Sequence, residues 1–167
     1  MEFEYRRGGT LAYLAAYNVH HAHAIGSIAA KTGIEPFGEL VETVMTTEPY
    51  ASARRVFWVV DNGSSHNGHR SIERMRASWP TATLAHLPVH ASWLNQVEIS
   101  FSILQRKAIN PADFTDPGDL ATRILAFQER TTPPRPPFDW TYTRTDLNNF
   151  LARLRRHDPE PITMRAA

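Results

Sequence analysis

The chain has 167 residues, the size of one domain, and its hydrophobic fraction of 42% is typical of a folded protein. Eighteen basic residues against 17 acidic ones leave a net charge of +1, so overall charge predicts no particular partner. The absence of cysteine excludes disulfides and thiol nucleophiles, and no apolar run is long enough to span a membrane. Because the N-terminus also lacks a signal-peptide pattern, a cytoplasmic protein is expected.

The first half of the chain predicts two strands, a helix and a third strand. Residues 10–19 favour a strand, and residues 21–29 favour a hairpin partner for it. Residues 35–48 carry apolar side chains at three- and four-residue spacing, which indicates an amphipathic helix. Residues 55–60 form a near-continuous apolar run, the pattern of a strand buried on both faces. This run ends at residues 61–63, Asp-Asn-Gly, which are a turn signal.

The second half predicts one strand and four helices. Ser64 and Ser65 offer an N-cap for a helix through about Ala77. Ser92 is the expected cap of a helix whose apolar stripe comprises Trp93, Leu94, Val97, Phe101, Leu104 and Ala108. The remaining elements are a strand at residues 81–87 and helices at residues 117–130 and 145–156. This order of elements predicts an α/β protein with a mixed sheet flanked by helices.

Two carboxylates are candidates for chemistry. Asp61 follows the apolar strand directly, at the edge where α/β sheets keep their active sites, although an Asp in a turn also binds local backbone N–H groups. Glu98 lies about 40° around the predicted helix from Leu94, at the margin of the apolar stripe, where a flanking Glu also covers core residues. The strand, helix and loop between Asp61 and Glu98 can return the chain to one cleft. Paired carboxylates suit hard cations such as Mg²⁺ or Mn²⁺.

The segments around these two residues resemble a known family. Residues 59–66, Val-Val-Asp-Asn-Gly-Ser-Ser-His, and residues 92–107, which begin Ser-Trp-Leu-Asn-Gln-Val-Glu, resemble the second and third catalytic motifs of DDE transposases. The resemblance is to the bacterial insertion-sequence, mariner-related group, and it extends from about Phe3 to Trp140. It implies a ribonuclease-H-like fold.

The resemblance assigns roles residue by residue. Asp61 and Glu98 match the second and third metal-binding carboxylates, which hold two Mg²⁺ or Mn²⁺ ions in an intact enzyme. Asn62, His66 and Asn95 match positions that support the site or contact the substrate. The implied activity is metal-dependent DNA strand cleavage and strand transfer. The implied partners are the transposon ends and target DNA, which places the protein at the bacterial nucleoid.

The sequence departs from the family before Asp61. The family carries its first catalytic Asp on the first core strand, and no Asp precedes Asp61 here. We therefore expect a partial catalytic domain at residues 1–130 that lacks this strand. Residues 131–167 are expected to form a Pro-rich connection and a C-terminal helix. Such a chain would be inactive alone and prone to associate, unless a missing N-terminal half or a homo-oligomer completes it.

Two other functions stay open on the sequence. One is a non-catalytic DNA-binding or interaction module that keeps the fold without the chemistry. The other is a ribonuclease-H-like nuclease in which Glu2 or Glu4 substitutes for the absent carboxylate.

Basic residues and histidines give weaker signals. The candidates for DNA contact are Arg70, Arg74, Arg106 and Lys107, which are equally typical of solvated helix faces. The histidines gather as His20, His21 and His23, and as His66 and His69. A transition-metal site is one interpretation of these groups, and surface histidines are the preferred one.

Overall fold

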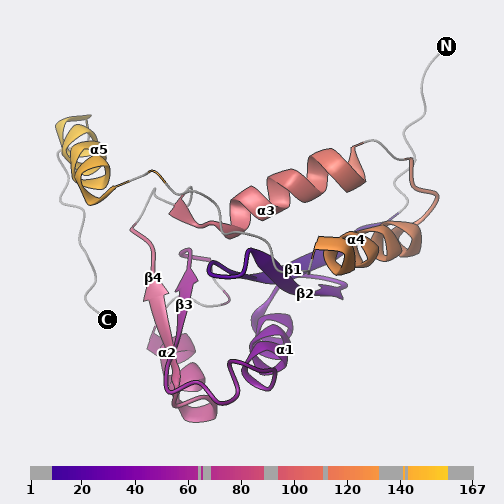
Figure 1. Cartoon of the computed structure of the whole chain (residues 1–167), viewed down its shortest axis with the longest axis horizontal. Coiled ribbons are helices and arrows are strands. Elements are labelled where there is room, and N and C mark those ends of the chain that lie inside the picture. The colour runs from indigo at the N-terminus through magenta and orange to yellow at the C-terminus, as the bar shows by residue number, and fades with distance from the viewer. Residues whose placement is uncertain are drawn as a thin grey trace.

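The structure is a computed structural model that describes residues 9–63, 65, 69–88, 94–110, 113–131, 141 and 143–157. Figure 1 shows the elements, which are β1 (Ala12–Asn18), β2 (His23–Ala29), α1 (Ile34–Met45), β3 (Val56–Val60), α2 (His69–Ser78), β4 (Ala82–His86), α3 (Val97–Leu104), the π-helical turn η2 (Gln105–Ile109), α4 (Pro117–Thr131) and α5 (Arg144–His157). Every predicted strand and helix is therefore present, in the predicted order.

The strands form two separate two-stranded sheets within the described residues, so the prediction of one mixed sheet is wrong there. β1 and β2 are antiparallel, with Ala16 opposite Ile25. β3 and β4 are parallel, with Trp58 opposite Leu84. Alternation of apolar and polar residues predicts strands but not which strand edges pair. Here β1 and β3 do not pair with each other.

Helix α1 connects the two sheets through a shared apolar core. Its buried residues Leu40, Val41, Val44 and Met45 pack with Trp58 and Val60 of β3 and with Met75 of α2. Leu14 and Ala16 of β1 pack against the same cluster. Because strand side chains alternate between faces, the intervening residues of the hairpin point the other way.

The opposite face of the β1–β2 hairpin is covered by a second cluster. Leu104, Ala108 and Ile124 are buried there, and Tyr13 of β1 packs against them. The rings of Tyr13 and Phe101 meet edge to face at 6.0 Å. In Figure 1, α1 and α3 accordingly lie on opposite sides of the hairpin. At the π-turn, Asn110 N–H donates to the Gln105 carbonyl, five residues earlier, at 2.8 Å.

Strand β3 is not buried on both faces, which corrects the sequence prediction. Trp58 and Val60 face the core, whereas the side chains between them are open: Phe57 is 64% exposed and Val59 is 52% exposed. The sequence alone could not reveal this exposed face, because a run of apolar residues looks the same for a strand covered on one face as for a strand covered on both. In the described residues the covering layer lies on one face.

Two helices begin later than the sequence predicts. α2 begins at His69 rather than at the Ser64–Ser65 pair, and the Ser65 carbonyl instead accepts a hydrogen bond from Ser71 Oγ at 3.2 Å. α3 begins at Val97, and Asn95 accepts the first backbone hydrogen bonds of the helix. Ser64, Ser92 and Trp93 lie outside the described residues.

The last two helices start at side-chain caps. Asp116 Oδ1 accepts from the N–H of Gly118 at 2.6 Å and of Asp119 at 3.0 Å, at the start of α4. Thr143 and Asp146 exchange hydrogen bonds at the start of α5, which is a capping box. Figure 1 shows α5 apart from the other helices, and none of the described helices is both long and apolar enough to cross a membrane.

Candidate active site

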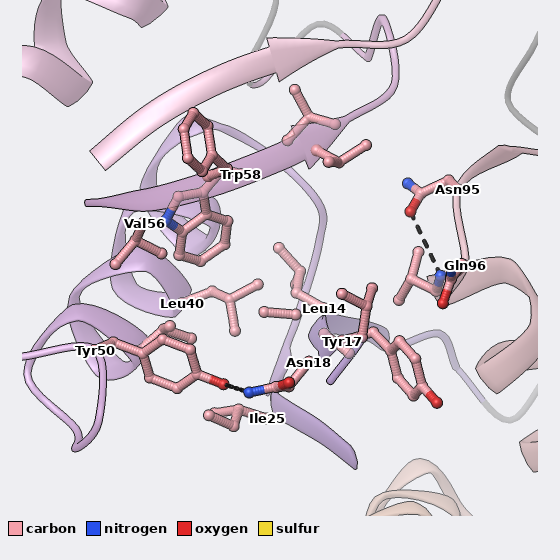
Figure 2. Close-up of a pocket in the computed structure, with 18 of the residues that line it drawn as sticks. Leu14, Tyr17, Asn18, Ile25, Leu40, Tyr50, Val56, Trp58, Asn95 and Gln96 are labelled. Atoms are coloured by element: carbon pink, nitrogen blue, oxygen red, sulfur yellow. Dashed lines mark hydrogen bonds between the residues drawn. The ribbon is translucent and has the colours of Figure 1, made fainter. Parts of the chain in front are cut away.

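A groove of about 740 Å³ separates the two sheets. Its walls are β1 on one side and β3 on the other, with side chains of α1 between them and the start of α3 across from these. Figure 2 shows Leu14, Leu40 and Trp58 directed toward one another in the groove, with Asn95 and Gln96 at its opposite side. Asp61 and Glu98, the two predicted carboxylates, both line this groove.

Asp61 is half-buried at the carboxyl end of β3. Its Oδ1 accepts a hydrogen bond from the N–H of Gly63 at 2.9 Å, which fixes the turn after the strand. The local turn role that the sequence offered for Asp61 is therefore present.

Glu98 lies in the first turn of α3 and is exposed to solvent. Asn95 positions this turn: its carbonyl accepts from Glu98 N–H at 3.0 Å, and its Oδ1 accepts from Val97 N–H at 3.4 Å. Asn95 itself lines the groove. These contacts hold Asn95 immediately before Gln96, the N-cap of α3, and so against the turn that carries Glu98.

Asn62 is exposed and ties together the ends of the parallel strands. Its Nδ2 donates to the Leu87 carbonyl, just after β4, at 3.1 Å. This contact holds the β3–Asp61 turn against the chain that leaves β4. His66, the other predicted neighbour of Asp61, lies outside the described residues.

The four basic candidates are all exposed and do not converge on one surface. Arg70 and Arg74 lie on α2, and Arg106 and Lys107 lie on η2. Figure 1 places α2 well away from α3 and its π-turn. Only Arg106 and Lys107 continue the helical run that carries Glu98.

The histidines show no metal centre among the described residues. His21 and His23 face each other with ring centroids 6.4 Å apart, and His69 pairs with Glu73 at 3.1 Å on the exposed side of α2. Nowhere in the described ranges do three or more His, Asp or Glu side chains gather at metal-binding distance.

The same limit applies to the carboxylate pair. Asp61 and Glu98 supply oxygen donors of the kind that Mg²⁺ and Mn²⁺ accept. Within the described residues no third His, Asp or Glu joins them in a group that could hold a metal ion.

Sequence reasoning did not single out Tyr50 or Gln96, which also line the groove. Tyr50 accepts a hydrogen bond from Nδ2 of Asn18, at the end of β1 (Figure 2). No signal along the chain could have found this contact, because 32 positions separate the two residues and only folding brings them together.

One carboxylate after β3 and a second one at the start of α3 thus line one groove of an α/β protein. The family comparison narrows this class. The model of the DDE superfamily endonucleases matches residues 2–121, more than half of the chain, and the chain belongs to that family. Endonucleases of this superfamily cut DNA with the help of divalent metal ions. The curated proteins and the solved structures give no match.

Proposed function

We propose that the chain is the catalytic part of a DDE transposase of the bacterial insertion-sequence, mariner-related group, with a ribonuclease-H-like fold. Its reaction is metal-dependent cleavage of a DNA strand, followed by transfer of the cut end to target DNA. The observation that carries the proposal is the convergence of Asp61 and Glu98 on one groove in a chain of this family.

The residues in and near the groove have separate roles in this proposal. Asp61 and Glu98 hold the divalent cation, Mg²⁺ or Mn²⁺, which supplies charge neutralisation and an activated water when bound. Asn95 is a positioning residue, because it sets the first turn of α3 that carries Glu98. Asn62 holds the Asp61 turn against the end of β4. Arg106 and Lys107, further along the same helical run, contact the phosphate backbone.

A third oxygen donor is needed to complete the site. Two metal ions repel each other, and a pair of carboxylates offsets this repulsion only partly. We propose that the third donor comes from outside the described residues, on another segment or another subunit. The chain alone is then a weak metal binder with little or no strand-cleavage activity.

Metal binding tests the assignment without requiring activity. Mn²⁺ titration followed by electron paramagnetic resonance should show weak binding to the wild-type chain. Asp61→Asn and Glu98→Gln should each weaken it at least tenfold, because each removes a charged ligand at nearly constant shape. The matched control is Glu42→Gln, on the exposed face of α1. Equal Mn²⁺ affinity in all four proteins would remove Asp61 and Glu98 from the site.

Plasmid nicking tests the chemistry itself. Supercoiled DNA incubated with the chain and Mn²⁺ should stay intact or be nicked slowly, and any nicking should disappear in Glu98→Gln. Nicking that survives both Asp61→Asn and Glu98→Gln contradicts the proposed mechanism. The alternative nuclease, which uses Glu2 or Glu4, predicts loss of nicking in Glu4→Ala, although both residues lie outside the described ranges.

The non-catalytic DNA-binding module remains the second candidate, and one observation favours it. No group of three or more His, Asp or Glu side chains that could hold a metal ion occurs among the described residues, and a two-metal reaction requires several such ligands. If the chain binds DNA in Mg²⁺ with an affinity that neither Asp61→Ala nor Glu98→Ala changes, this second function replaces the first.

A further inference from the structure

A smaller pocket of about 310 Å³ lies between α2 and β4. Residues 82–84, three in a row on β4, line it. Because strand side chains alternate between faces, contact with successive residues indicates that the pocket lies at the edge of the strand. Figure 1 shows β4 on the side of β3 that is away from the β1–β2 hairpin. The pocket is therefore separate from the groove lined by Asp61 and Glu98, to which no residue of β4 contributes.

The outer edge of β4 presents backbone hydrogen-bonding groups. Val56 N–H donates to the Thr81 carbonyl at 2.9 Å, so Thr81 directs its carbonyl toward β3. The contacts of a parallel pair recur at every second residue, so Thr83 and Ala85 also direct their backbone groups toward β3. Leu84 lies between these two and directs its N–H and C=O groups to the outer edge. Among the described strands, β4 pairs only with β3, and such an edge is a template for another strand.

The pocket combines an apolar wall with a cation. Ile72 and Met75 of α2 form the wall together with Leu84. Arg76 also lines the pocket, is exposed to solvent and has no acidic partner among the described residues. The helix α2 as a whole carries three arginines and one glutamate, so its field is positive. An occupant that brings one aliphatic side chain and a carboxylate complements both parts of the pocket.

We propose that the outer edge of β4 binds an extended, acidic peptide segment of a partner protein. The segment pairs with the backbone of Leu84, and its central aliphatic side chain enters the pocket. An acidic residue two positions along lies on the same face of the added strand, where it meets Arg76. This inference rests on the pocket and on the backbone of β4, and it does not depend on the proposed function.

Two other occupants fit the site less well. A nucleic acid would satisfy Arg76, but it has neither a strand backbone for Leu84 nor an aliphatic side chain for the wall of the pocket. A second copy of the chain, paired edge to edge through β4, would bring two positive α2 helices to neighbouring positions, which charge repulsion disfavours.

A synthetic peptide tests the proposal directly. The probe is the fluorescein-labelled, amidated heptapeptide Ser-Glu-Thr-Ile-Thr-Glu-Ser, titrated with the full chain in EDTA. We expect a saturable rise in anisotropy with one peptide bound per chain. Replacing both glutamates of the peptide by lysine should weaken binding about tenfold or more, and methylating its backbone nitrogens should abolish binding because the ladder cannot form. EDTA removes metal ions, so this proposal and the proposed metal site can each fail alone.

Matched variants locate the binding site on the chain. Arg76→Gln should weaken binding of the glutamate peptide about fivefold, the effect of one exposed ion pair. Arg70→Gln, the same change on α2 but outside the lining of the pocket, should leave the affinity unchanged. The lysine peptide should bind Arg76→Gln at least as tightly as it binds the wild-type chain, because the variant removes a repulsion.

Amide hydrogen exchange provides a readout that needs no variant. In the free chain the Leu84 amide should exchange about tenfold faster or more than the amides of Thr83 and Ala85, which face β3. The glutamate peptide should slow the exchange of Leu84 selectively.

Four results would overturn the proposal. The first is no anisotropy change at millimolar peptide while circular dichroism shows a folded chain. The second is equal affinity of the glutamate peptide for the wild-type chain and Arg76→Gln. The third is protection of Leu84 that grows with chain concentration in step with sedimentation, which would make a second copy of the chain the occupant instead. The fourth is displacement of the peptide by a DNA duplex whose own affinity falls in Arg76→Gln but not in Arg70→Gln, which would make the pocket a DNA contact.

Discussion

Gly26 lies in strand β2, where the atoms around it leave no space for a side chain. A Cβ on Gly26 would lie 2.6 Å from Cε2 of Tyr13 and 2.8 Å from the Leu14 carbonyl oxygen. The carbonyl belongs to the paired strand and cannot move away without breaking the hairpin. We predict that Gly26→Ala lowers the free energy of unfolding by about 1–3 kcal/mol, measured by urea denaturation.

The control for this substitution is Gly38→Ala. Gly38 is in the middle of α1, and a Cβ there meets nothing within 4 Å. The variant should gain about 0.5–1 kcal/mol, because alanine is the better helix former. If both variants destabilise equally, the close approach at Gly26 is not the cause.

Tyr13 predicts an alkaline transition. Burial raises the pKa of Tyr13 from its ordinary value of 10.0 to about 12. Its hydroxyl donates to Oε1 of Gln128 at 2.7 Å, which also requires the protonated form. Above pH 10 the unfolded chain therefore binds fewer protons than the folded one. Stability should fall as the pH rises from 10 toward 12.

Urea denaturation between pH 9 and pH 12 measures this effect. Tyr13→Phe should cost about 1 kcal/mol at neutral pH through the lost hydrogen bond and should flatten the alkaline decline. The control is Gln128→Ala, which removes the acceptor of the same hydrogen bond and keeps the phenol. It should lower stability at neutral pH and retain the alkaline decline, because burial is the main cause of the raised pKa of Tyr13. An alkaline slope that persists unaltered in Tyr13→Phe contradicts the assignment.

At the scale of elements, the turn of the β1–β2 hairpin contains one residue, Ala22, with a strained backbone conformation. Ala22 has a φ of 53°, in the left-handed region, while Asn18 Oδ1 accepts from the N–H groups of His20 and His21 at 2.9 Å. Ala22→Gly should stabilise the chain by a few tenths to about 1 kcal/mol, since glycine adopts this φ without steric cost.

Thermal unfolding followed by circular dichroism checks this prediction against a matched variant. Ala24→Gly, two residues on in β2, should lose about 0.5–1 kcal/mol, because glycine weakens a strand interior. A stabilisation at both positions, or at neither, would show that the turn conformation is not the determinant.

The spacing of apolar residues predicted which helices and strands are present, but it predicted the first residues of some helices incorrectly. Apolar spacing placed α1 and α4 within a few residues of their observed bounds. The predicted starts of α2 and α3 were wrong. Serines that can cap a helix precede both, but each helix begins several residues after them. α3 begins at Val97, with Asn95 accepting hydrogen bonds from its first turn, and the Ser65 carbonyl accepts a hydrogen bond from Ser71 Oγ inside α2. A sequence shows which residues can cap but not which one meets the helix end.

At the scale of the whole molecule, α1 is the element that connects the two sheets. Leu40 is 3% exposed and belongs to the apolar cluster that includes residues of both β1 and β3. Leu40→Ala should therefore cost about 2–5 kcal/mol. The loss should also increase the exchange of amides in both sheets together, which hydrogen exchange measures.

Glu42→Ala, on the exposed face of the same helix, serves as the control and should change stability by less than about 0.5 kcal/mol. If Leu40→Ala loosens only the β1–β2 hairpin, the sheets are stabilised independently and α1 does not connect them.

The sequence by itself determined the elements, their order, and the two carboxylates with the motifs around them, because these depend on local propensity and on residue identity. Tertiary structure alone decided which strand edges pair, that β3 is open on one face, and that Asp61 and Glu98 share a groove with Tyr50 and Gln96. These features are contacts between residues far apart in the chain. Their geometry is fixed by how α1 and α3 pack around the strands, and no local pattern encodes that packing.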